Sequence, residues 1–202
     1  DKTGTLTQNK MVVEKIATAS HPITITGDGY NPIGDFMESH SPEKIENLEL
    51  YPELESLLIA GVICNDAVLQ RENGEGEWLI LGDPTEGSLL SLGGKAGIFR
   101  EEQTQILPRV AEFPFSSERK RMSVICQLSG NNRQWAVPVP NSPSVSYIMF
   151  TKGSPELTLE CCTHIVTGKS FKEITPAQRE QILEENNQMA DQGLRVLGLA
   201  YK

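Results

Sequence analysis

The chain has 202 residues, 38% hydrophobic and 22% charged, a composition typical of a soluble globular protein rather than a disordered one. Its 27 acidic residues outnumber its 18 lysines and arginines, which gives a formal net charge of −9 at pH 7. This balance argues against a general nucleic-acid-binding protein, which needs a basic face, but it permits a local basic pocket. The longest apolar run, over 57–64, is too short to span a bilayer, and no signal peptide follows Asp1.

The chain opens without a methionine, so we expect it to be a piece of a longer protein. Its four cysteines are Cys64, Cys126, Cys161 and Cys162. They lack the paired spacing of a zinc site, and adjacent cysteines rarely form a disulfide with each other. We therefore expect structural thiols in a reducing, cytoplasmic setting.

The first half of the chain predicts short strands and then two helices. Residues 5–7, 11–13 and 23–26 are typical of strands, and a loop rich in Gly, Pro, Asn and Ser extends to residue 50. Apolar residues between 54 and 62 recur at helical spacing, which predicts a helix from Pro52 to about Leu69. Asp83-Pro84-Thr85-Glu86 predicts a second helix, because an N-cap residue precedes proline at N1 and an acid at N3. We expect Gly93-Gly94 to weaken that helix.

The second half alternates strands and helices. Strands are predicted over 110–113, 122–128 and 147–151, and an extended hairpin with a loose tip over 129–146. Helices are predicted over 155–162 and from Thr175-Pro176 to a stop at Gly193, with a last strand over 195–200. Distant strands separated by helices indicate an α+β fold with an antiparallel sheet.

The clearest chemical signal is the segment Asp1-Lys2-Thr3-Gly4-Thr5-Leu6-Thr7. A carboxylate at a strand end, followed by a turn with glycine and hydroxyls, presents a nucleophile beside backbone N–H groups that can hold phosphate oxygens. The segment resembles the phosphorylation motif of the P-type ATPases without a gap. It also resembles haloacid-dehalogenase-like phosphatases, whose second aspartate would stand at Thr3. We interpret the loss of that general acid as slowing hydrolysis of an aspartyl-phosphate. The alternative is a strand-to-turn junction in an unrelated protein.

Four further segments resemble the nucleotide-binding domain of the P-type ATPases in order and separation: 82–86, 113–124, 151–156 and 193–197. Together with the first motif they cover essentially the whole chain. The resemblance implies the fold of that domain, an antiparallel sheet of about six strands flanked by helices. It also implies a phosphorylation-domain stub and hinge over 1–16 and a nucleotide-binding domain over 17–202, without the return hinge.

The resemblance implies a set of nucleotide-binding residues, each with a structural alternative. Phe115 would stack on adenine, and the alternative is a core aromatic on an alternating strand. Glu86 would lie near the adenine amino group, although a helix-capping role also explains it. Arg195 would reach the nucleotide phosphates, and Lys152 would meet phosphate or ring nitrogens unless it is a solvated strand-end lysine. The full set is Glu86, Phe115, Lys120, Met122, Lys152, Gly153, Arg195 and Leu197.

Within the basic cluster, strand alternation predicts that Lys120 and Met122 share a face with the Phe115 pocket. For Arg119 and Arg121 we prefer a solvated edge.

The resemblance also implies the catalytic residues and the cofactors of the intact pump. Asp1 would be the phosphorylated aspartate, with Lys2 and Thr3 beside it, and Asp1 and Thr3 would bind Mg²⁺. The cofactors are ATP and Mg²⁺. The magnesium-binding acidic motif and the catalytic lysine of the family do not follow in this chain. We therefore expect the chain to bind nucleotide without turnover.

The implied partners are the phosphorylation, actuator and transmembrane domains of the same pump, at the cytoplasmic face of a membrane. The chain itself would be soluble and monomeric, without a nucleic-acid partner. The segments 7–11 and 29–32 look most like the calcium-pump branch of the type II pumps, while the transported ion stays open. Two other functions compete. One is an acidic α+β protein-interaction module without nucleotide binding, and the other is a stand-alone phosphatase that lacks its downstream lysine and paired aspartates.

Overall fold

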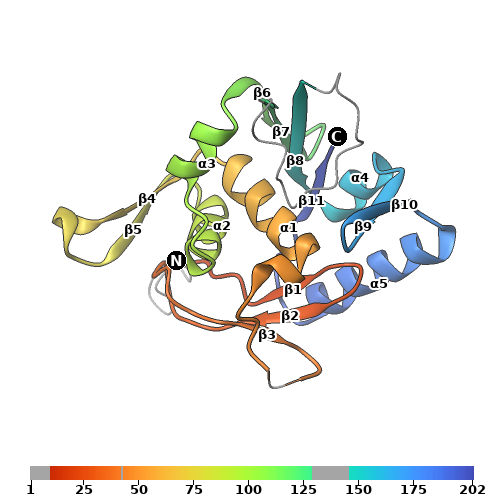
Figure 1. Ribbon diagram of the computed structural model, residues 1–202, viewed down its shortest axis with the longest axis horizontal. Coiled ribbons are helices and arrows are strands. Elements are labelled where there is room, and N and C mark those ends of the chain that lie inside the picture. The colour runs from red at the N-terminus through yellow and green to blue at the C-terminus, as the bar shows by residue number, and fades with distance from the viewer. Residues whose placement is uncertain (1–9, 42, 129–145) are drawn as a thin grey trace.

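The computed structural model describes residues 10–41, 43–128 and 146–202 (Figure 1). Within these residues the strands form four antiparallel sheets. One sheet has the order β1 (Lys15–Ala17), β2 (Pro22–Ile25), β3 (Phe36–Glu38). The largest has the order β11 (Gly198–Tyr201), β8 (Tyr147–Gly153), β7 (Arg121–Gln127), β6 (Arg109–Ser116). Two hairpins pair β4 (Val68–Arg71) with β5 (Trp78–Leu81) and β9 (His164–Thr167) with β10 (Ser170–Glu173).

Five α-helices lie between and around these sheets: α1 (Pro52–Ile63), α2 (Pro84–Lys95), α3 (Arg100–Ile106), α4 (Pro155–Glu160) and α5 (Pro176–Asp191), as far as the described residues go. Short 3₁₀ turns, η1 (Leu48–Leu50) and η2 (Glu72–Gly74), precede α1 and join β4 to β5. The α+β class with antiparallel pairing is therefore confirmed.

The expected single sheet of about six strands differs from the structure, in which the largest sheet of the described part has four strands. In Figure 1, α1 lies between the β1–β3 sheet and the four-stranded sheet. One hydrophobic core contains Ile23 from the small sheet, Leu58 from α1 and Phe150 from β8. Each sheet thus buries its apolar side chains in a core that α1 shares, and neither extends the other.

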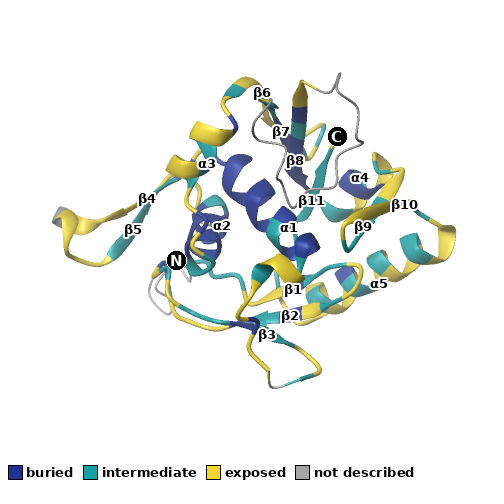
Figure 2. Cartoon of the chain, viewed as in Figure 1, coloured by how far each residue is buried: buried dark blue, intermediate teal, exposed yellow. Residues whose placement is uncertain are grey.

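Helix α1 is buried along nearly its whole length (Figure 2). Its start at Pro52 agrees with the prediction, but it ends at Ile63 instead of continuing to about Leu69. The reason lies outside the helix, because the Arg109 guanidinium binds the carbonyl of Ile63 at 2.6 Å and also that of Asn65. The prediction was too long because the apolar pattern in the sequence continues beyond Ile63, where the contacts with Arg109 end the helix.

Helix α2 begins where the capping signal predicts, with the Asp83 carboxylate accepting hydrogen bonds from the backbone N–H groups of Thr85 and Glu86. It continues through Gly93 and Gly94 to Lys95, so the expected weakening there is wrong. A Cβ at Gly93 would collide with Val62 of α1, and one at Gly94 with Pro32. The two glycines therefore allow close packing of α2 on its neighbours, which compensates for their low helix propensity.

Other predictions succeed or fail by element. The strands near 110, 122 and 147 and the helices from 155 and 176 are confirmed. No strand forms over 11–13, the last strand runs over 198–201, and sequence analysis missed α3 and the hairpins β4–β5 and β9–β10. The expected boundary at residue 16 falls inside β1. The predicted hairpin over 129–146 lies outside the described residues except for Ser146.

The cysteines divide into two groups. Cys64 and Cys126 are fully buried, Cys162 is half-buried and Cys161 is exposed, and all four are free thiols. Within the described part of the chain, no helix is both long and apolar enough to cross a bilayer.

Candidate functional site

One end of the four-stranded sheet brings distant parts of the chain together. Ser116 of β6 lies opposite Arg121 of β7, Arg121 opposite Gly153 of β8, and Gly153 opposite Gly198 of β11. This row crosses all four strands. Six of the predicted nucleotide-binding residues stand on the row or next to it in sequence: Phe115, Lys120, Met122, Lys152, Gly153 and Leu197. We call this end of the sheet, with Glu86, the strand-end site.

The turn between β6 and β7 is locked onto the end of β8. Lys120 closes the turn with a φ of 52°, and its N–H donates to the Ser116 carbonyl at 2.8 Å. Its own carbonyl accepts from the Ser154 N–H at 2.9 Å. A Cβ at Gly153 would collide with that carbonyl, so only glycine fits where the backbones approach so closely. The prediction that Lys120 shares a face with Met122 is wrong, because Lys120 lies in the turn and strand alternation does not reach it.

Phe115 is 61% exposed, so the alternative of a core aromatic does not hold. Its neighbour Phe113 is also exposed, and the pairing register shifts between Phe113 and Ser116. The Arg119 guanidinium lies 5.6 Å from the Phe113 ring centroid and donates to the Ser123 hydroxyl at 3.2 Å. Arg119 is thus half-buried over the sheet and lies against the Phe113 ring, so it is not a solvated edge residue, and the Phe115 ring stays exposed.

Met122 and Lys152 lie opposite each other in adjacent strands, and their side chains therefore share a face. That face is the core face, where Met122 is 2% exposed. The Lys152 side chain is only 8% exposed, so the alternative of a solvated strand-end lysine is wrong. A lysine this deeply buried requires a charged partner.

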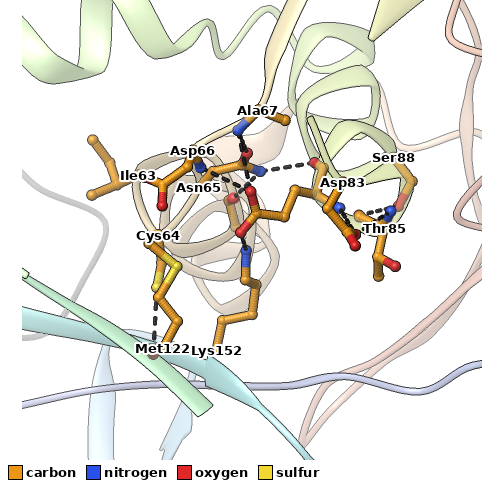
Figure 3. A network of polar contacts seen from close by, with 12 residues as sticks. Ile63, Cys64, Asn65, Asp66, Ala67, Asp83, Thr85, Ser88, Met122 and Lys152 are labelled. Carbon is orange, nitrogen blue, oxygen red and sulfur yellow. Dashed lines mark hydrogen bonds and ion pairs between the residues drawn. The ribbon is translucent and has the colours of Figure 1, made fainter. Parts of the chain in front are cut away.

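The partner is Glu86 in the first turn of α2. Lys152 Nζ lies 2.8 Å from Glu86 Oε1, and the Glu86 side chain is 18% exposed. Glu86 Oε2 accepts hydrogen bonds from the backbone N–H groups of Asp66 at 3.0 Å and Ala67 at 3.1 Å. Figure 3 shows Lys152 pointing from the sheet toward this segment after α1. The Glu86 carboxylate therefore connects α2 with the 65–67 segment and β8. The cap of α2 is formed by Asp83 and not by Glu86.

Sequence analysis missed the residues that hold the 65–67 segment. Asn65 is fully buried, and its amide bonds with Gly61, Ala67 and Glu86. Arg109 donates to Asp66 Oδ1 at 2.8 Å, and Arg100 donates to the Ala67 carbonyl at 2.6 Å. An Asn-Asp pair directly after a buried helix is a turn signal, but no local pattern links it to arginines more than 30 positions away.

Arg195 is exposed and precedes β11, and its charge acts on Asp83 at the start of α2. Burial acts to raise the pKa of Asp83, but hydrogen bonds from the Thr85 side chain and from the Glu86 and Thr85 N–H groups outweigh it. With the Arg195 charge they leave this pKa below its usual value. Arg195 thus lies within electrostatic range of the helix turn that carries Glu86.

The predicted catalytic residues Asp1, Lys2 and Thr3 lie outside the described residues. Among residues 10–41, 43–128 and 146–202, no group of three or more His, Cys, Asp or Glu side chains could hold a metal ion.

Comparison with known proteins identifies the family. The sequence profile of the P-type ATPase cytoplasmic domain N matches residues 53–202. The chain belongs to the P-type ATPases. Among relatives of this P-type ATPase chain, a cation-transporting ATPase pma1 from Synechocystis is 33% identical over 100% of the chain and 20% of the relative. A calcium-transporting ATPase from Bacillus subtilis is 33% identical over 100% of the chain and 21% of the relative.

A calcium-transporting ATPase type 2C member 1 from Bos taurus is 36% identical over 99% of the chain and 19% of the relative. The P-type ATPase chain thus spans about a fifth of the length of the relatives it matches.

Proposed function

We propose that the strand-end site binds the adenosine end of ATP. In this proposal Phe115 stacks on adenine, Glu86 accepts a hydrogen bond from the adenine amino group, and Lys152 beside Glu86 meets a ring nitrogen. Lys120 and Arg195 face the charged part of the nucleotide. Met122, Gly153 and Leu197 shape the wall of the site. We assign nucleotide binding to residues 17–202 and a hinge and phosphorylation-domain stub to residues 1–16.

One observation carries this proposal. Residues that sequence analysis assigned to the nucleotide from three separate segments, 113–124, 151–156 and 193–197, lie along one row at the end of the sheet or next to it. The row carries an exposed aromatic ring, and beside it lies a half-buried carboxylate that already holds a buried lysine. An aromatic face suits any purine, and a carboxylate suits the amino group that distinguishes adenine from guanine.

In the full-length protein, we propose that the site delivers ATP to Asp1 in a cation-transporting ATPase. An Asp1 carboxylate oxygen bonds to the γ-phosphorus while the bond from that phosphorus to the β–γ bridging oxygen breaks, and ADP leaves. Water then hydrolyses the acyl phosphate, which releases inorganic phosphate and restores the carboxylate. Mg²⁺ bound by Asp1 and Thr3 would neutralise the phosphate charge. Energy from this cycle would move the cation through the transmembrane domain of the same pump, with the phosphorylation and actuator domains as further partners.

The names of two relatives favour calcium as that cation, since the proteins from Bacillus subtilis and Bos taurus are calcium-transporting ATPases. The pma1 relative carries the broader name, so cation transport is the common element.

A titration of the chain with ATP, AMP and GTP, without magnesium and monitored by backbone amide chemical shifts, tests nucleotide binding. We expect saturable binding of ATP in the sub-millimolar range, weaker binding of GTP, and shifts around Phe115 and Lys152. No shift up to about 10 mM ATP, equivalent to about −2.7 kcal/mol, contradicts the proposal. That result would favour an acidic protein-interaction module instead.

A further inference from the structure

Asn65 lies directly after α1 and has no solvent exposure. Its side-chain amide donates from Nδ2 to the Gly61 carbonyl at 3.2 Å and to the Glu86 main-chain carbonyl at 2.8 Å. Its Oδ1 accepts from the Ala67 N–H at 3.0 Å. All three bonds go to backbone groups, so this amide ties the end of α1 to the first turn of α2.

The Ala67 N–H connects Asn65 with the Glu86 carboxylate. It donates both to Asn65 Oδ1 and to Glu86 Oε2, the latter at 3.1 Å. Asn65 therefore holds Glu86 at two places, directly at its main-chain carbonyl and indirectly through the N–H group that orients its carboxylate.

The remaining capacity of Glu86 explains why this orientation matters. A carboxylate has about four acceptor positions. Two are used by the N–H groups of Asp66 and Ala67, and one by Lys152 Nζ. One position on Oε1 is left for a ligand donor. This free position points toward the ligand only while the carboxylate keeps its orientation. If the carboxylate rotated, Oε2, which already accepts two hydrogen bonds, would face the ligand instead.

We propose that Asn65 is a positioning residue that fixes the Glu86 carboxylate and thereby sets the preference of the strand-end site for adenine over guanine. This inference rests on the proposed nucleotide binding. Adenine offers an amino donor where guanine offers the O6 acceptor, so a correctly aimed carboxylate attracts one base and repels the other. Asn65 itself does not touch the ligand.

Asparagine suits this position because a primary amide offers two donor hydrogens and an acceptor. An ionised aspartate offers no donor, so it would lose the hydrogen bonds to the Gly61 and Glu86 carbonyls and add a negative charge beside Glu86. A protonated aspartic acid has nearly the same shape and keeps one donor and one acceptor. Burial and the nearby Glu86 charge would raise the pKa of the introduced carboxyl.

The test measures the dissociation constants of ATP and GTP for the whole chain by titration calorimetry, between pH 5.5 and 8.5. For Asn65→Asp we expect an ATP-to-GTP affinity ratio near that of the wild type at the acid end. We expect the ratio to fall at least tenfold at the alkaline end, while the wild-type ratio stays constant. The terminal phosphates of both nucleotides titrate alike, so their effect cancels in the ratio.

Asn186 provides a matched control. It is also buried, at 8% exposure, and its Nδ2 donates to Glu156 Oε1 at 2.9 Å, far along the chain from Glu86. Asn186→Asp also places a carboxyl beside a glutamate and should lower the melting temperature. It should leave the ATP-to-GTP ratio unchanged at every pH. Thermal unfolding at each pH confirms that the variants are folded.

Glu86→Gln separates the two proposals. If the wild type does not bind ATP, both fail. If the wild type discriminates and Glu86→Gln does not, but Asn65→Asp keeps its selectivity at pH 8.5, only the role of Asn65 is overturned. Should Asn65→Asp not fold at pH 8.5, Asn65→Ser replaces it. Its shorter side chain should lower the ratio at least fivefold without pH dependence, and an unchanged ratio refutes the inference.

Discussion

Phe115 keeps a large apolar ring in solvent at the end of β6, next to buried residues of β7. Such exposure contributes nothing to the core, so the ring is available for a ligand. Phe115→Ala should therefore weaken ATP binding by about 1–3 kcal/mol, or roughly five- to 150-fold. The free energy of unfolding should change by less than about 0.5 kcal/mol, since the side chain is exposed.

The matched control is Phe171→Ala in β10, because Phe171 is also exposed but lies outside the strand-end site. Its ATP affinity should equal that of the wild type. An unchanged affinity in the Phe115 variant means that adenine does not stack there.

Whether the role of a residue could be predicted depends on how far along the sequence its deciding partner lies. Phe115, Lys152 and Glu86 stand in motifs that can be read locally, and the structure brings Glu86 and Lys152 within 2.8 Å. The role of Asn65 depends on Glu86, 21 positions away, and no periodicity reveals such a bond. Lys120 was misplaced because strand alternation was extended into a turn.

Among the described residues, three α-helices begin with side-chain caps, α2, α4 and α5, and of these only α2 carries a predicted site residue. Asp83 caps α2, and Thr175 forms a capping box with Gln178 at the start of α5. Replacing an N-cap residue with alanine typically costs about 1 kcal/mol. Asp83→Ala should lose about this much stability in urea denaturation and also weaken ATP binding, because the first turn of α2 orients Glu86.

Thr175→Ala should lose a similar amount of stability and bind ATP like the wild type. If both variants bound ATP equally well, the first turn of α2 would have no role in ATP binding, and this prediction would be wrong. The starts of α2 and α5 were predictable because capping is local. The end of α1 was not, because Arg109 reaches the Ile63 carbonyl from a later segment.

At the scale of the whole molecule, the core is continuous from the small sheet through α1 to the four-stranded sheet. Cys64 and Cys126 lie in this core with no solvent exposure, and Cys64 donates to the Met122 carbonyl across the helix–sheet interface. Burial raises the pKa of each thiol from 9.0 to about 11. The number of sheets was not predictable, because which strands pair depends on how both sheets pack around α1.

These thiols give a pH dependence of stability with a definite sign. Above pH 9 the unfolded chain loses thiol protons that the folded chain keeps, so the free energy of unfolding should fall between about pH 9 and 11. For Cys64 the full effect is about 3 kcal/mol. Urea denaturation at pH 8 and 10.5 should show a smaller fall in Cys64→Ala/Cys126→Ala. Cys161→Ala, at an exposed position, should match the wild type.

The hydrogen bonds from the Asp66 and Ala67 amides to Glu86 have a consequence for hydrogen exchange. These two amide protons are held by a carboxylate that belongs to another helix and is itself bound to a third element, β8. Their exchange with solvent deuterium is therefore controlled by contacts between elements rather than by local secondary structure. Withdrawal of the Glu86 carboxylate frees the Asp66 proton, whereas the Ala67 proton also has to leave Asn65 Oδ1. Two adjacent residues on a loop thus record two different openings of the strand-end site.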